Sequence, residues 1–110
     1  MEYTDLSLGF STADAEDVQL EFDGSDLVLT CLDWQENRVR YSFRDVLAYR
    51  WGQDVEVEGL RDDQAYEILE SPWLEREAAL AAVDCREYGH YKLCFNGCGV
   101  LDVLSRKEDS

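Results

Sequence analysis

The sequence predicts an α+β fold that is mainly β: an antiparallel sheet of about six to eight strands with one short helix before a C-terminal hairpin. Three observations predict it. Apolar and polar residues alternate in several short segments, which is typical of strands with one solvated face. Ser71-Pro72 is a helix-start signal in front of an alanine-rich segment. Asn96-Gly97 is a strong turn signal between two apolar segments.

The strands are predicted from periodicity and residue type. Residues 18–22 and 39–43 alternate strictly, while residues 27–32 are almost continuously apolar, as in a strand buried on both faces. The full set of predicted strands is residues 6–10, 18–22, 27–32, 39–43, 46–51 and 66–69, followed by the two strands of the C-terminal hairpin. The pattern is compatible with a meander of hairpins that stays open and with one that closes partly into a barrel.

The helix is predicted over residues 73–83, with Ser71 as its N-cap. Four alanines raise its helix propensity, and Trp73, Leu80 and Val83 share a broad face. Glu75 lies in the first turn, where the helix dipole favours an anion.

The C-terminal hairpin has two competing registers. A three-residue loop over residues 96–98 places Lys92 opposite Asp102 and Leu93 opposite Leu101. A two-residue loop would instead place Lys92 opposite Leu101. The first register pairs like with like on both faces, so the sequence favours it.

The chain is expected to fold as a single domain over residues 1–110. Its hydrophobic fraction is 45% and its aromatic fraction is 12%, whereas disordered acidic chains are poor in both. Residues 1–17 and 107–110 are expected to be less ordered. Because no secretory signal or membrane-spanning run is visible, we expect a cytoplasmic protein with reduced cysteines.

The net charge of −15 limits the classes of partner. Nucleic acids and anionic membranes are bound through Lys and Arg, so both are disfavoured. A basic protein partner is favoured, because long-range attraction raises the rate of association. The alternative is that the acidity only keeps the protein soluble.

The acidic residues are concentrated between Gln53 and Glu77, which holds nine acidic and two basic residues. Such a run beside aromatic residues fits an interface with aromatic anchors and a charged rim. The predicted partner-binding residues are Asp54, Glu56, Glu58, Asp62, Asp63, Glu67 and Glu70, with Trp51 and Trp73 as anchors. The alternative is that the run is a solvated face and that each Trp is a core residue.

Cys85, His90, Cys94 and Cys98 are the residues from which a metal site or a thiol-dependent active site could be built. Zinc takes Cys and His ligands, but the spacing lacks the usual matched pairs. His90 and Cys94 lie on one side of an extended strand, yet too far apart for direct proton transfer. We therefore expect no metal, no cofactor and no catalysis, and treat a small metal- or thiol-dependent enzyme as the alternative.

The chain resembles the small acidic immunity proteins of bacterial polymorphic and contact-dependent toxin systems. The resemblance rests on RDVLAYRWG, on YEILESPWL entering a helix and on the closing HYKLCFNGCGVLDVL hairpin, and it spans residues 18–105. It implies a non-catalytic protein that binds a cognate toxin domain, commonly basic, and blocks its active site. A structural adaptor subunit remains an alternative, and the protein could be a monomer or a homodimer; the sequence identifies neither toxin nor strand order.

Overall fold

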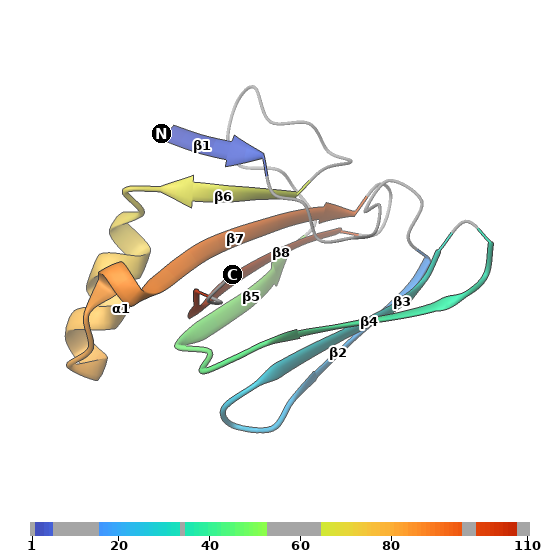
Figure 1. Cartoon of the computed structure of the whole chain (residues 1–110), viewed down its shortest axis with the longest axis horizontal. Helices are drawn as coiled ribbons and strands as arrows, with labels where there is room; N and C mark the ends of the chain where they lie inside the picture. Colours follow the sequence, from blue (N-terminus) through green and yellow to red (C-terminus); the bar gives the residue numbers. More distant parts are fainter. Residues whose placement is uncertain (1, 6–15, 34, 53–64, 96–98, 108–110) are drawn as a thin grey trace.

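The computed structural model describes residues 2–5, 16–33, 35–52, 65–95 and 99–107, and Figure 1 shows the path of the chain. The described elements are β1 (Glu2–Asp5), β2 (Glu16–Phe22), β3 (Leu27–Leu32), β4 (Arg38–Phe43), β5 (Ala48–Gly52), β6 (Ala65–Leu69), α1 (Pro72–Ala81), the 3-10 helix η1 (Cys85–Glu87), β7 (Tyr88–Phe95) and β8 (Gly99–Arg106). The strand expected at residues 6–10, the acidic residues 54–63 and the loop 96–98 lie outside the described residues.

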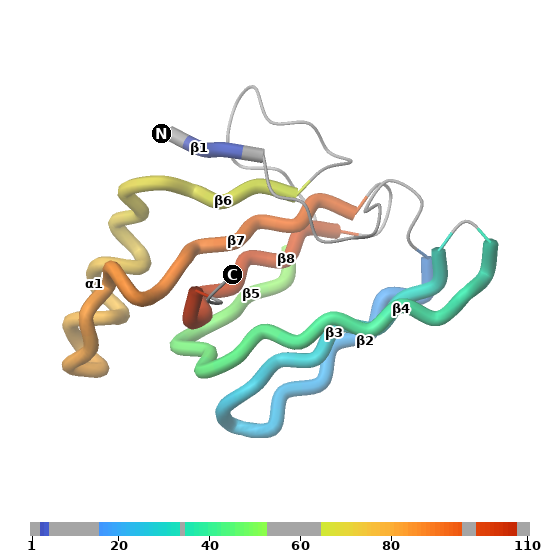
Figure 2. The backbone as a smooth tube through the Cα atoms, viewed as in Figure 1, coloured from blue at the N-terminus to red at the C-terminus, as the bar shows by residue number. Residues whose placement is uncertain are grey.

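The described strands form two antiparallel sheets. The larger sheet has the order β1-β6-β7-β8-β5, and the smaller has the order β2-β3-β4. Figure 2 shows the chain passing from β4 around a corner into β5, and so from one sheet to the other. The expected class, α+β and mainly β, is confirmed. The sheet is not closed into a barrel, and the strands divide between two sheets rather than forming one.

Strand β1 is formed by residues that carry no clear period in the sequence. It pairs antiparallel with β6, so that Tyr3 lies opposite Ile68. The Tyr3 and Tyr66 rings meet edge to face, with centroids 5.2 Å apart. Aromatic pairs in this geometry stabilise beyond the area they bury. Pairing with a strand far away in the chain therefore orders this segment.

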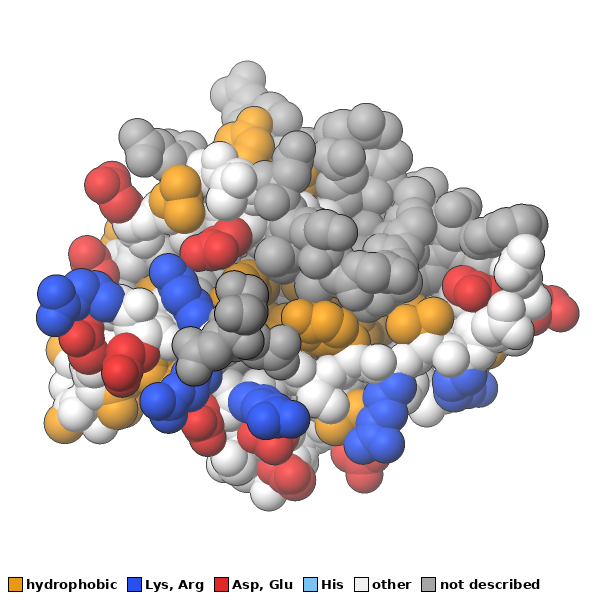
Figure 3. Space-filling model, viewed as in Figure 1, with side chains coloured by type: hydrophobic (Ala, Val, Ile, Leu, Met, Phe, Trp, Pro, Cys, Tyr) orange, Lys and Arg blue, Asp and Glu red, His pale blue; other side chains and the backbone are white. Residues whose placement is uncertain are grey.

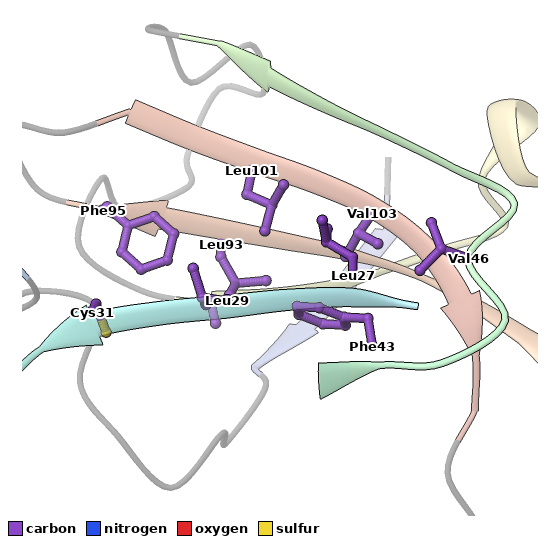
Figure 4. Packing of buried hydrophobic residues seen from close by; sticks show 10 residues of the cluster. Leu27, Leu29, Cys31, Phe43, Val46, Leu93, Phe95, Leu101 and Val103 are labelled. Carbon is purple, nitrogen blue, oxygen red and sulfur yellow. The ribbon is translucent and has the colours of Figure 1, made fainter. Parts of the chain in front are cut away.

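The main core lies between the two sheets. Strand β3 sends alternate residues inward, Leu27, Leu29 and Cys31, and each is at most 1% exposed. Figure 4 shows Leu27 and Leu29 beside Leu93 and Leu101 of the larger sheet, and Cys31 towards Phe95. The strand was expected to be buried on both faces, but its intervening residues are only half-buried.

The hairpin of β7 and β8 has the favoured register. Lys92 lies opposite Asp102 and Leu93 opposite Leu101. Because side chains alternate across a strand, this register sends Leu93 and Leu101 into the core between the sheets. It sends Lys92 and Asp102 to the other face, which α1 partly covers.

Helix α1 begins as predicted but buries a different face. Ser71 is the N-cap and Pro72 the first helical residue. The buried residues are Leu74 and Ala78, whereas Leu80 is 77% exposed. The face that holds Leu80 is therefore not the one that packs on the sheet. Leu74 and Ala78 are four residues apart and lie on one stripe of the helix, and Leu74 packs with Tyr88 and Leu104 of the sheet.

Candidate functional site

The predicted partner-binding residues divide into those the structure describes and those it does not. The described ones are Trp51, Glu67, Glu70 and Trp73. The others, Asp54, Glu56, Glu58, Asp62 and Asp63, lie outside the described residues.

The two described carboxylates of this set differ in their surroundings. Glu67 is half-buried on β6, and its Oε2 lies 3.7 Å from Lys107 Nζ. Glu70 is exposed and connects β6 to α1 with a left-handed φ of 54°. Glu67 is thus partly neutralised, while Glu70 makes no ion pair with another described residue.

The two predicted anchors lie on opposite faces of the larger sheet. Trp51 stacks on Phe95, a member of the core between the sheets, with centroids 5.9 Å apart. Trp73 belongs to α1 and meets the ring of His90 edge-on, with centroids 5.2 Å apart. The structure therefore does not bring Trp51 and Trp73 together in one patch.

A buried polar network lies between α1 and the larger sheet. It consists of Ser71, His90, Lys92 and Asp102, whose exposed fractions are 3%, 5%, 2% and 4%. Ser71 Oγ lies 2.8 Å from His90 Nδ1, and His90 Nε2 lies 2.8 Å from Asp102 Oδ1. Lys92 Nζ donates to both Asp102 oxygens, at 3.1 and 3.0 Å.

The strand pattern assembles this network. His90 and Lys92 are two residues apart on β7 and so point to the same face. The hairpin register sets Asp102 directly across from Lys92. Ser71 arrives from outside the sheet, because it caps α1 through a bond from the Leu74 N–H at 3.2 Å.

Protonation states follow from the partners. Burial alone raises the pKa of Asp102, but hydrogen bonds from His90 and Lys92 together outweigh it and bring the pKa below its ordinary value of 3.8. An ionised carboxylate only accepts, so His90 Nε2 carries the proton and donates to Asp102. In the neutral ring Nδ1 then accepts from the Ser71 hydroxyl.

Arg50 and Trp73 lie at the border of the network. Arg50 Nε is 3.5 Å from Asp102 Oδ2, and its side chain is half exposed. Its guanidinium lies 4.8 Å from the centre of the Trp73 ring, in cation–π geometry. These two side chains link the helix to β5, the outermost described strand on that side of the sheet.

The order hydroxyl, imidazole, carboxylate is the connectivity used by serine hydrolases. A nucleophilic hydroxyl must reach its substrate, however, and Ser71 is only 3% exposed. The Ser71 oxygen already accepts the Leu74 N–H, and Lys92 neutralises the carboxylate that would otherwise stabilise an imidazolium. The arrangement thus satisfies buried polar groups and fastens α1 to the sheet.

Of the residues considered for a metal or thiol site, the structure describes Cys85, His90 and Cys94. Both ring nitrogens of His90 are engaged, and Cys94 lies four residues further along β7, about 13 Å away. Cys85 lies in η1, and Cys98 is outside the described residues. No group of three or more His, Cys, Asp or Glu side chains in the described ranges could hold a metal ion.

The thiols of the described part are structural in their surroundings. Cys31 and Cys85 form no disulfide within the described residues. Cys94 is fully buried in a cluster with Tyr66, Ile68 and Val100. Burial raises the pKa of the Cys31 thiol, which disfavours the nucleophilic thiolate.

Three aromatic side chains remain exposed on the outer strands β2 and β5. Phe22 of β2 is 41% exposed, and Tyr49 and Trp51 of β5 are 39% and 38% exposed. The Phe22 and Tyr49 rings lie 5.2 Å apart. The alternation of residues 18–22 predicted an inward-facing Phe22, but it gave no sign that this strand is at a sheet edge.

Replacing Ser71 by alanine should destabilise the protein by about 1–2 kcal/mol, because the helix loses its N-cap and His90 loses a partner. Urea unfolding monitored by circular dichroism measures the change. Ser71→Thr keeps the hydroxyl and is the matched control, from which we expect a smaller loss. Equal losses in the two variants would mean that the hydroxyl contributes nothing.

Comparisons with known proteins found no matching family model, no matching curated protein and no matching solved structure. Among the described helices, none is both long and apolar enough to span a membrane.

Proposed function

We propose that this protein is a non-catalytic inhibitor that binds one basic protein, in the manner of an immunity protein that neutralises its cognate toxin domain. The observation that carries the proposal is the charge. The chain has 25 acidic residues against ten Lys and Arg, a net charge of −15. Even with every base paired, most of the acidic side chains keep an uncompensated charge.

Ion pairs within the described surface offset only part of this charge. Asp17 pairs with Arg38 at 3.8 Å, and Asp45 pairs with Arg106 at 3.5 Å. On the face shown in Figure 3, acidic and basic side chains lie next to each other at the α1 end of the molecule. Exposed pairs of this kind contribute little to stability and leave the overall negative field in place.

The proposed mechanism is occlusion of the partner's active site. A basic toxin that acts on nucleic acid needs a cationic surface for phosphates, and carboxylates can occupy that surface instead. Electrostatic attraction accelerates the encounter, and aromatic contacts then slow dissociation. No step requires a bond to be made or broken by this chain. We place this interaction in the cytoplasm, where free thiols remain reduced.

The proposal is tested by neutralisation. The C-terminal domain encoded by the gene immediately upstream is the first partner to express in a bacterial host. Its expression should arrest growth, and coexpression of this protein should restore growth and yield a stable complex. A complex that forms without restoring growth would indicate an adaptor subunit instead. If this protein catalysed a reaction, and a single Cys substitution abolished that activity, it would be an enzyme instead.

Reversing two charges in the acidic stretch, Asp62→Lys with Asp63→Lys, should slow association with that domain about tenfold at low salt and weaken the salt dependence. Stopped-flow mixing at several salt concentrations measures both. The matched control is Glu36→Lys with Glu87→Lys, two exposed sites that change the net charge equally. If both pairs slow association to the same extent, only the total charge matters. Asp62 and Asp63 would then not belong to the contact surface.

A further inference from the structure

Two outer strands meet at an exposed aromatic surface. Among the described strands, β2 is outermost in the smaller sheet and β5 is outermost in the larger. Phe22 of β2 contacts Tyr49 of β5, with ring centroids 5.2 Å apart and planes at 59°. Trp51 lies two residues beyond Tyr49 and so points to the same face. We call Phe22, Tyr49 and Trp51 the aromatic seam.

The seam is exposed, whereas its neighbour on the adjacent strand β8 is buried. Its three rings are 38–41% exposed. Leu101, directly opposite Trp51 on β8, is fully buried. Neighbouring aromatic rings left in contact with water are typical of interaction surfaces, while apolar residues exposed singly, such as Leu80, need no such explanation.

The Trp51 ring is held in place before any partner arrives. It stacks on Phe95 with planes at 28°. It also lies directly over Gly99, where a Cβ atom would come within 2.5 Å of Trp51 Cζ2 and 2.8 Å of the Gly52 carbonyl oxygen. Gly99 has a φ of 141°, so both space and backbone conformation require glycine there. An anchor that is already ordered loses little entropy on binding.

Carboxylates lie at the Phe22 end of the seam. Asp23 follows Phe22 at the start of the turn and is exposed, whereas the exposed Glu21 alternates to the opposite face of β2. The turn after Phe22 is fixed to the corner before β5, because the Asp45 N–H donates to Asp26 Oδ1 at 3.1 Å and the Val46 N–H to the Ser25 carbonyl at 2.7 Å. These bonds bring Asp23, Asp26 and Asp45 to one end of the seam.

The cations near the seam offset only part of this charge, because Asp23 and Asp26 form no ion pair with a described residue. Arg106 pairs with Asp45 at 3.5 Å. Arg50 is on β5 but alternates to the opposite face, where it meets Trp73 and Asp102. The surroundings of the seam therefore select a positively charged occupant over a neutral or acidic one.

Resting on the proposed function, we propose that the aromatic seam is the contact surface for a segment of the basic partner that presents Arg and Lys side chains. Cations stack on Trp, Tyr and Phe faces, and neighbouring carboxylates add charge-assisted hydrogen bonds. The contact of Arg50 with Trp73 is the same chemistry within the chain. Trp51 is then the anchor that meets the partner, and Trp73 is not.

A six-arginine peptide serves as the probe, and a six-glutamine peptide is its control. Binding at low salt is measured by fluorescence anisotropy for the intact protein and for Phe22→Ser with Tyr49→Ser. The double variant should bind the arginine peptide about tenfold more weakly. Leu80→Ser, which removes an exposed apolar side chain from α1, should leave binding unchanged. Phe22→Leu with Tyr49→Leu keeps the seam apolar without its rings and should bind as weakly as the serine variant.

Two-dimensional nuclear magnetic resonance gives a second readout. The indole N–H signal of Trp51 should shift on adding the arginine peptide, and that of Trp73 should not. Salt-sensitive binding with unchanged affinity in both seam variants would overturn the seam and leave the proposed function standing. Absence of any binding at low salt would overturn both. A dimer in sedimentation analysis that Tyr49→Ser dissociates would show that the occupant is a second copy, which also overturns the proposal.

Discussion

Replacing Asp102 by alanine should lower the free energy of unfolding by about 3–5 kcal/mol. The variant leaves the Lys92 ammonium, which is 2% exposed, without its carboxylate, and it leaves the His90 Nε2–H without an acceptor. The loss of the Arg50 contact adds little to this cost, because the half-exposed guanidinium can be solvated instead. Urea unfolding of the variant and the parent measures the difference.

A double variant separates the cost of an orphaned charge from the value of the pair. Asp102→Leu with Lys92→Met removes both charges together and should recover most of the stability lost in Asp102→Ala. His90 still lacks an acceptor, so recovery should stay incomplete. A loss of stability below about 1 kcal/mol in Asp102→Ala would contradict the network as described. A buried ammonium without a partner should destabilise the folded state by more than that.

The same carboxylate gives the protein a pH dependence of known sign. The folded pKa of Asp102 lies below 3.8, so its stabilising contribution is fully present above that value and is lost as the pH falls through the folded pKa. Asp23 and Asp84 also have lowered pKa values, the first through backbone hydrogen bonds and the second through Arg86. Stability measured from pH 5 down to pH 2 should therefore fall less steeply in the Asp102→Leu, Lys92→Met variant than in the parent.

Local features were readable from the sequence. Ser71-Pro72 predicted where α1 begins, because capping and the fixed φ of proline act within a few residues. The register of β7 and β8 was predicted because only one alignment puts Lys92 opposite Asp102 and keeps Leu93 beside Leu101. Both signals need only a short stretch of chain.

Long-range arrangement was not readable. Alternation of apolar and polar residues predicts a strand but not the strand with which it pairs. The pairing of β1 with β6 and the division into two sheets could therefore not be predicted from it. The placement of Trp51 and Trp73 on opposite faces follows from that arrangement. Their positions on either side of the acidic stretch had suggested a single interface.

Strand periodicity alone predicts part of the buried network but not all of it. His90, Lys92 and Asp102 share one face by alternation and register, so the sequence contained that part of the group. Ser71 joins only because α1 packs back over the sheet, and burial turns these four polar residues into a closed network. Grouping His90 with the cysteines missed this, because Ser71 and Asp102 come from other elements.

Replacing Leu101 by alanine should destabilise the protein by about 2–5 kcal/mol. Leu101 is fully buried in the central part of β8 and belongs to the cluster that joins the two sheets (Figure 4). Its truncation opens a cavity between sheets that hold each other chiefly through this cluster. Urea unfolding measures the loss, and Leu80→Ala on α1, at a side chain 77% exposed, is the control that should stay within about 0.5 kcal/mol.

Leu101 also connects the core to the aromatic seam, because it lies directly opposite Trp51 across the β5–β8 pairing. Leu101→Ala should therefore broaden the Trp51 indole signal, while Leu101→Met, which nearly conserves volume, should cost less than about 1.5 kcal/mol and leave that signal sharp. If Leu101→Ala proved as stable as Leu80→Ala, the two sheets would not pack through this residue. The rigid seating of Trp51 would then have to come from Phe95 and Gly99 alone.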